Sequence, residues 1–265
     1  MNTNNLYKQY FFKILSSRKG SGDKQYSVYP FILNYYFFQY FGRYFSAIVT
    51  PVFILLNIRP NFVSIARYFM CIASFFLLLC NSDYITFRII FFSLLVNYFL
   101  LDYVDGDIAR AKEISTFYGR LLDGWIDIHL QACIYLFAGY IIYQTTSDFS
   151  YLYISIIIFF MVFITNLNID RYASFRRWIK EDHGIDIGTH TLNNLFKSFR
   201  QIHSEIIIFN LTMGCFVINL FSLKILLLYG LFWNIIYFLY YLFLQFINVN
   251  NVNDISDKPK YDGPV

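Results

Sequence analysis

Six apolar runs limit what this chain can fold into more than any other feature of its sequence. Each is long enough, or nearly so, to cross a bilayer as a helix, which takes about 20 predominantly apolar residues. The 265 residues are 57% hydrophobic and only 14% charged, which is typical of a polytopic membrane protein and not of a soluble domain. We therefore expect an all-α fold with six transmembrane helices. The runs cover residues 62–80, 87–104, 122–144, 150–169, 205–221 and 225–247.

The segment before the first run is expected to lie at the membrane surface. Residues 1–28 are polar and basic and lack the pattern of a cleaved signal, so we expect no cleavage. The stretch 30–56 is rich in aromatic residues, but Gly42, Arg43 and Pro51 interrupt it. This composition favours an amphipathic helix in the interface over one that crosses. If it did cross, only the N-terminus would change sides.

Basic residues predict the orientation of the helices. Lys and Arg concentrate in the N-terminal segment, between runs two and three, and between runs four and five. The positive-inside rule then puts both termini and these links in the cytoplasm. We accordingly divide the chain into a cytoplasmic N-terminal segment with the interfacial helix (1–61), a six-helix transmembrane domain (62–247) and a polar cytoplasmic tail (248–265). The link 170–204 is expected to be a solvated hairpin, with a second metal site from its acidic and histidine residues as the less favoured alternative.

Four aspartates stand at the link between runs two and three. The sequence there reads D-Y-V-D-G-D-I-A-R from Asp102, then eight residues, then G-R-L-L-D-G-W-I-D, which ends at Asp127. Asp102 and Asp105 are three apart and Asp123 and Asp127 are four apart, so each pair shares one face of a helix. Two helix ends therefore present four carboxylates to each other at a membrane boundary. Ionisable groups at such a depth are a functional-site hypothesis by default.

Four carboxylates in one cleft repel each other unless cations lie between them. Ligand sets made only of oxygen favour hard ions such as Mg²⁺ or Mn²⁺. A pair of divalent cations would neutralise the four charges and still attract a diphosphate. We therefore expect two divalent cations, Mg or Mn, as cofactors.

The aspartate run resembles the signature of the CDP-alcohol phosphotransferases, D-x2-D-G-x2-A-R-x8-G-x3-D-x3-D, at every defining position. A chance match to eight fixed positions is on the order of 10⁻¹⁰ per starting point. The resemblance implies that Asp102, Asp105 and Asp123 are metal ligands and that Asp127 is both a metal-site carboxylate and the catalytic general base. It also implies that four further residues, with Asp105, bind the cytidine nucleotide: Gly106, Ala109, Arg110 and Gly119.

A second stretch, Pro60-Asn61-Phe62-Val63-Ser64, is similar to the one that precedes the first span in many members of the same family. There it lies near the nucleotide, so Asn61 and Ser64 are further candidates for nucleotide binding. Its alternative reading is an ordinary helix start. Arg67, one turn later, either extends to the lipid headgroups or holds a phosphate. Arg171, in the link 170–204, is a candidate for anionic headgroups or a phosphorylated acceptor.

The resemblance implies a reaction in which a CDP-linked donor passes its substituted phosphate to an alcohol and releases CMP. CDP-diacylglycerol with a small alcohol, in phospholipid biosynthesis, is the pairing we expect first. The alternative is a CDP-headgroup donor of the inositol, choline or ethanolamine type, and the stretch 21–30 has a faint similarity to the inositol branch. A small cation transporter is the alternative of another class. Membrane lipids and a second copy of the chain are the expected partners, and nucleic acid is not.

Overall fold

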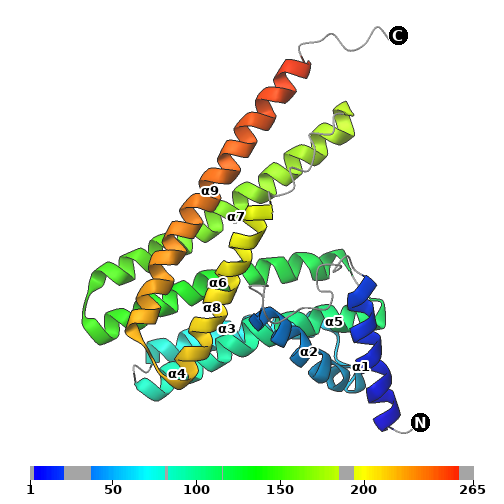
Figure 1. Ribbon diagram of the computed structural model, residues 1–265, viewed down its shortest axis with the longest axis vertical. Helices are drawn as coiled ribbons and strands as arrows, with labels where there is room; N and C mark the ends of the chain where they lie inside the picture. Colours follow the sequence, from blue (N-terminus) through cyan, green and yellow to red (C-terminus); the bar gives the residue numbers. More distant parts are fainter. Residues whose placement is uncertain (1–2, 21–36, 81–82, 115, 185–193, 257–265) are drawn as a thin grey trace.

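The computed structural model describes residues 3–20, 37–80, 83–114, 116–184 and 194–256. Every regular element in these ranges is helical, as the sequence predicts (Figure 1). In chain order they are α1 (Thr3–Gly20), α2 (Phe37–Leu55), α3 (Pro60–Cys80), α4 (Tyr84–Leu95), the π-helix η2 (Val96–Leu101), α5 (Asp102–Lys112), α6 (Phe117–Thr146), α7 (Phe149–His183), α8 (Asn194–Phe216) and α9 (Leu220–Ser256).

Within the described residues, five helices are long and apolar enough to cross a membrane, which makes this an integral membrane protein. They are Pro60–Cys80, Tyr84–Lys112, Phe117–Thr146, Phe149–Glu181 and Leu220–Ile247. The count of six is not confirmed, because the apolar part of α8 is shorter, Ile202–Phe216. The expected fifth run, 205–221, is in fact divided between two helices. Asn219 accepts hydrogen bonds from the backbone N–H groups of Phe221 and Ser222 and so caps the start of α9 within the apolar run.

Two buried clusters hold the helices together. The larger one joins α3, α4, α6, α7, α8 and α9, with α6 at its centre: Leu130, Ile134, Phe137 and Ile141 are all fully or almost fully buried. The smaller one joins α1, α2, α3 and α5 and is built from residues such as Ile14, Ala47, Val63 and Ile108. The second cluster lies at the end of the bundle that carries the aspartates.

The described residues of the N-terminal segment form two helices, whereas the sequence predicts one. The helix α1, in the region read only as polar and basic, packs on α2 and α5; its Tyr7 hydroxyl donates to the carbonyl of Ile48 at 2.8 Å. The helix α2 corresponds to the expected interfacial helix, and its apolar part, Phe41–Leu55, is shorter than a usual span. Residues 30–36, and the stretch 21–30 compared with the inositol branch, lie outside the described residues.

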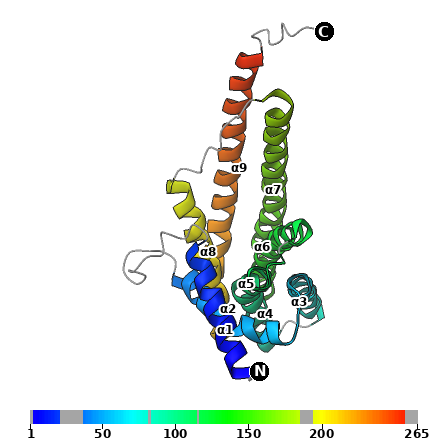
Figure 2. The same cartoon turned by 90° about the vertical axis from the view of Figure 1, so that its right-hand side faces the viewer.

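The helices α7 and α9 run side by side and project together from the rest of the bundle (Figures 1 and 2). With 35 and 37 residues, they are about 52 and 56 Å long at 1.5 Å per residue, well beyond the ~30 Å of a hydrocarbon core. Asp148 caps α7, and the bond from the backbone N–H of Ser150 lowers the pKa of that carboxyl. The C-terminal parts of α7 and α9 extend into the segments 170–204 and 248–265, which were expected to be irregular.

Two sequence predictions are corrected by these extensions. The hairpin expected over 170–204 is helical to His183, where Gly184 ends α7 in the left-handed conformation, and again from Asn194. The tail expected from 248 onward is helical to Ser256, because α9 continues past the proposed boundary at 247. Two of the residues considered for a second metal site, Asp186 and His190, lie outside the described part. The division into three domains stays a prediction.

We predict that Gly139→Ala destabilises the protein by about 1–3 kcal/mol, because overpacking a tight contact forces the backbone or a neighbour to shift. A Cβ at Gly139 in α6 would lie 2.3 Å from the side chain of Ser155 and 2.8 Å from the carbonyl oxygen of Tyr151, both in α7. Gly124→Ala, in the same helix, is the matched control, since a Cβ there meets nothing within 4 Å. Thermal unfolding in detergent measures both. Equal melting temperatures for the two variants would contradict the packing described.

Candidate active site

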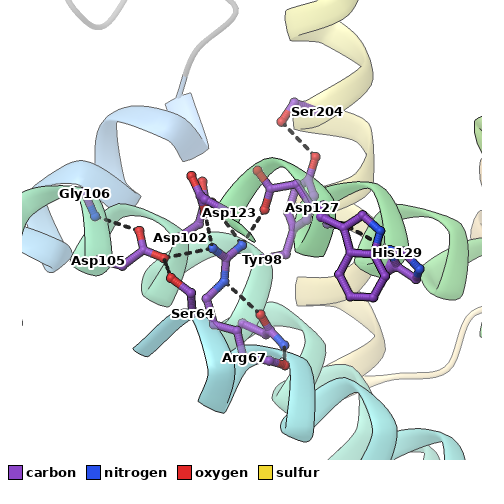
Figure 3. Close-up of polar contacts among 12 residues, drawn as sticks. Ser64, Arg67, Tyr98, Asp102, Asp105, Gly106, Asp123, Asp127, His129 and Ser204 are labelled. Carbon is purple, nitrogen blue, oxygen red and sulfur yellow. Dashed lines mark hydrogen bonds and ion pairs between the residues drawn. The ribbon is translucent and has the colours of Figure 1, made fainter. Parts of the chain in front are cut away.

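Four carboxylates converge on a single guanidinium, that of Arg67 (Figure 3). Its Nη1 lies 3.1 Å from Asp105 and 2.8 Å from Asp123, and its Nη2 lies 2.9 Å from Asp102 and 2.6 Å from Asp127. The Arg67 side chain is 0% exposed, whereas Asp123 and Asp127 are 40% and 45% exposed. The aspartates therefore cover the buried Arg67 guanidinium, and Asp123 and Asp127 are also partly exposed to solvent.

Three helices bring these residues together. Arg67 lies in the second turn of α3, Asp102 and Asp105 begin α5, and Asp123 and Asp127 lie in the second and third turns of α6. The i, i+3 and i, i+4 spacings put each pair on one helix face, and the two faces meet, as the sequence predicts. What the sequence did not predict is that Arg67 lies between them. Its predicted contact with a phosphate or headgroup stays a prediction.

Asn97 fixes Arg67 in place. Its Oδ1 accepts from Arg67 Nε at 3.2 Å, and its Nδ2 donates to the backbone carbonyl of Arg67 at 2.6 Å. Asn97 is 1% exposed and lies in η2, five residues before Asp102. In an α-helix, residues five apart point about 140° away from each other. The wider π turn, with its i→i+5 pairing, brings Asn97 and Asp102 to the same guanidinium, and π segments are frequent at functional sites.

The carboxylates fit a divalent cation. Asp102, Asp123 and Asp127 each offer an oxygen, and these atoms lie within 4.8 Å of one another. Asp105 joins the group through Arg67, and its second partner is the Ser64 hydroxyl, which donates to it at 2.8 Å. A set of carboxylate oxygens on rigid helices, partly open to solvent, has the chemistry that Mg²⁺ and Mn²⁺ require.

A cavity opens beside Asp105 and Asp123. Its lining contains every residue proposed to bind the nucleotide except Arg110. Pro60, Ile114, Thr116 and Arg120 complete it. The proposed residues present are Asn61, Ser64, Asp105, Gly106, Ala109 and Gly119.

The two signature glycines allow close approaches in this cavity. A Cβ on Gly119 would lie 2.9 Å from Asn61 Oδ1 and 3.1 Å from Thr116 Oγ1. Thr116 caps α6, since its hydroxyl oxygen accepts from the backbone N–H of Gly119 at 3.0 Å. Thr116 was not predicted from the sequence as part of the site, although a threonine three residues before the glycine is a recognisable helix start.

Arg110 is held outside the cavity lining by Asp107. Its Nη2 donates to Asp107 Oδ1 at 2.8 Å, and its guanidinium lies against Gly106, where a Cβ would meet it at 3.2 Å. Asp107 is 0% exposed, and the hydroxyl of Ser46 in α2 donates to its other oxygen. Asp107 stands at a variable position of the signature, so the resemblance gave it no role. Its sequence signal is the i, i+3 spacing to Arg110, which puts an opposite charge on the same helix face.

Polar groups of α8 lie close to the exposed side of the aspartates. The hydroxyls of Tyr98 and Ser204 are 3.4 Å apart, and Gly106 and Ser204 lie on opposite sides of the Arg67 guanidinium (Figure 3). One turn beyond Asp127, Gln131 contacts His203 Nε2 at 3.0 Å. This wall was not predicted from the sequence, because His203 and Ser204 lie 76 and 77 residues beyond Asp127 in the chain. His129, read from the sequence as a packed helix residue, bonds the carbonyl of Trp125 at 2.8 Å.

Arg171 is exposed on α7. Among the ion pairs of the described residues, none joins it to the four carboxylates. Its proposed role in binding a headgroup or a phosphorylated acceptor stays a prediction.

Long apolar helices around four carboxylates, with a cavity at their side, define a polytopic membrane protein with a polar site at one end of its bundle. The model of the CDP-alcohol phosphatidyltransferase family matches residues 57–240, and the chain belongs to this family. It is therefore a transferase that acts on a CDP-alcohol, in a family that uses divalent metal. No curated protein and no solved structure matched the chain in the corresponding comparisons.

We expect Gly119→Ala to weaken the binding of CMP, the nucleotide part of the donor, at least tenfold. The added methyl group would lie 2.9 Å from the Asn61 amide oxygen and push it into the cavity. Isothermal titration of the purified protein with CMP, in the presence of Mg²⁺, measures the effect. Gly124→Ala should bind CMP as the unchanged protein does. Unaltered CMP affinity in Gly119→Ala would place the nucleotide elsewhere.

Proposed function

We propose that the protein transfers a substituted phosphate from a CDP-linked donor, with CDP-diacylglycerol expected first, to the hydroxyl of a small alcohol, and releases CMP. The observation that carries this proposal is the convergence of the four signature aspartates next to a cavity lined by six of the residues expected to bind the nucleotide. The product would be a phospholipid, made at the cytoplasmic face where the positive-inside rule puts this end of the bundle.

Asp102, Asp105, Asp123 and Asp127 are the proposed metal ligands. When bound, two divalent cations would neutralise charge on the donor diphosphate and stabilise the departing CMP. The protein's own part is to bind and orient. Asn61, Ser64, Gly106, Ala109 and Gly119 hold the nucleotide against α3 and the starts of α5 and α6. Arg110 is proposed to turn from Asp107 toward a phosphate, where its planar fork of donors suits the oxygens.

Asp127 is the proposed general base. It is the most exposed of the four carboxylates, with 45% of its side chain accessible. A base needs the acceptor hydroxyl within hydrogen-bond reach, on the side of the phosphorus opposite the leaving CMP. In Figure 3, Tyr98 and Ser204 lie on one side of the guanidinium, and Asp105 and Gly106, which line the cavity, lie on the other. That arrangement supports an acceptor that approaches from the α8 side and a nucleotide that leaves from the cavity side.

The proposal is tested by feeding membranes that contain the protein with each labelled CDP donor in turn, followed by organic extraction and measurement of CMP. CDP-diacylglycerol should give CMP and an extractable phospholipid that depends on the added alcohol. A water-soluble product from CDP-inositol would assign the protein to the headgroup-donor branch instead. Metal flux without CMP release would support the transporter alternative. A homodimer, expected from the resemblance, stays a prediction.

We predict that Asp102→Asn, Asp105→Asn and Asp123→Asn each reduce metal-dependent transfer to the background level, because each removes a charged ligand from the proposed metal site. The measurement is CMP release from purified protein over a range of Mg²⁺ concentrations. Asp148→Asn, an exposed helix cap outside the spans, is the matched control and should retain full activity. Normal transfer by any of the three variants would show that its carboxylate is not a ligand.

Asp127→Asn should lower kcat by about 10²–10⁴-fold, the usual contribution of a general base, and leave CMP affinity within a factor of about three. An amide cannot take the proton of the acceptor hydroxyl, whereas the contacts of the nucleotide are retained. Steady-state kinetics and CMP titration on the same preparation separate the two effects. A large loss of nucleotide affinity with little change in kcat would make Asp127 mainly a metal ligand.

A further inference from the structure

Arg67 is a buried cation to which the proposed reaction gives no part. Its guanidinium is 0% exposed and contacts all four aspartates at 2.6–3.1 Å. We propose that Arg67 is a positioning residue that holds the four carboxylates together in the cation-free site and competes with divalent cations for their oxygens. The inference rests on the proposed function in one respect, namely that these carboxylates bind divalent cations.

The contact geometry supports competition. Each of the two Nη nitrogens bridges one carboxylate of α5 and one of α6: Nη1 joins Asp105 to Asp123, and Nη2 joins Asp102 to Asp127. A divalent cation binds carboxylate oxygens at about 2.0–2.1 Å for Mg²⁺. The oxygens of Asp102, Asp123 and Asp127 that could share an ion belong to residues whose Oδ1 atoms already accept from Arg67. A cation that binds the same Oδ1 atoms therefore has to displace the guanidinium, and one that binds the second oxygens of these carboxylates lies beside a like charge that weakens its binding.

The charges point the same way. Four carboxylates and one guanidinium sum to −4 + 1 = −3, which is a high charge for a site inside a helix bundle. Without Arg67, no positive side chain among the described residues would pair with the four carboxylates and offset their repulsion. They would separate until water or bound cations screened their charges. With two divalent cations the four carboxylates alone already sum to −4 + 4 = 0. Arg67 therefore stabilises the cation-free state and opposes the fully loaded one.

Asn97 decides how firmly Arg67 holds its place. It bonds both the Nε and the backbone carbonyl of Arg67, at 3.2 and 2.6 Å, from the π segment that leads into Asp102. The bond from Nε to Asn97 holds the guanidinium where it joins the side chain, and the two Nη nitrogens contact the aspartates. Loss of Asn97 would free Arg67 without removing its charge, so it should act in the same direction as loss of Arg67, and more weakly.

The test is the binding of Mn²⁺ alone to the purified full chain in detergent, measured by the electron paramagnetic resonance of free Mn²⁺, together with thermal unfolding in EDTA and in Mn²⁺. Arg67→Met should bind Mn²⁺ at least tenfold more tightly than the unchanged protein. In EDTA its melting temperature should be lower, because the aspartates lose their counter-charge. Mn²⁺ should raise that temperature by more than it does in the unchanged protein.

Two further variants keep the outcome decisive. Asn97→Ala retains the guanidinium and should bind Mn²⁺ about two- to fivefold more tightly, which tests the idea even if Arg67→Met does not fold. Arg88→Met is the matched control, since Arg88 lies in α4 and donates to the carbonyl of Cys215 at 2.8 Å, away from the aspartates. Its Mn²⁺ affinity should not change.

The outcomes separate this inference from the proposed function. If folded Arg67→Met or Asn97→Ala binds Mn²⁺ with equal or lower affinity than the unchanged protein, competition is wrong and Arg67 instead assists cation binding. If none of the proteins, including the unchanged one, binds Mn²⁺, the proposed metal site fails and this inference fails with it.

Discussion

The contact between one arginine and four aspartates governs the arrangement of the helices at one end of this membrane protein. A buried ion that lacks partners costs several kcal/mol, so the buried Arg67 requires carboxylates close by. Those carboxylates come from two other elements, α5 and α6. Because a guanidinium is planar and carries its donors in a fixed fork, the contacts constrain both the distance and the rotation of the three helices. Residues of the same three helices line the cavity beside Asp105 and Asp123, so its shape depends on these contacts.

The π segment η2 makes this geometry possible. It lets Asn97 and Asp102, which are five residues apart, both contact the Arg67 guanidinium. It does so within one continuous helix from Tyr84 to Lys112. A regular α-helix over the same sequence would point one of the two residues away. The segment therefore couples the buried anchor of Arg67 to the first carboxylate of the site.

A second polar contact ties the N-terminal helices to the same region. Asp107 is fully buried between Ser46 of α2 and Arg110 of its own helix. The exposed pair Lys13–Glu113, at 3.0 Å, joins α1 to the end of α5 but contributes little by itself. The apolar contacts of Ile14, Ala47 and Ile108 supply the larger part of that attachment. The helices α1 and α2 thus pack against the helix that carries the first half of the signature.

The sequence by itself determined the class of the fold, the four aspartates and six of the residues that line the cavity. The fold class and the two aspartate pairs follow from local rules, since the length of an apolar run sets a span and the spacings of Asp102, Asp105, Asp123 and Asp127 set helix faces. The six cavity residues were implied by the resemblance to the family signature. It also contained signals that were not used, such as the cap at Asn219, which divides an apolar run into α8 and α9.

Only the tertiary structure decided the partners of Arg67, Asn97 and Asp107, which lie about 30 to 60 residues away in the chain. No periodicity links residues so far apart. The sequence around Arg67 does not show whether its side chain contacts lipid, a phosphate or an acidic cluster. The packing of the surrounding helices determines which of these partners it contacts.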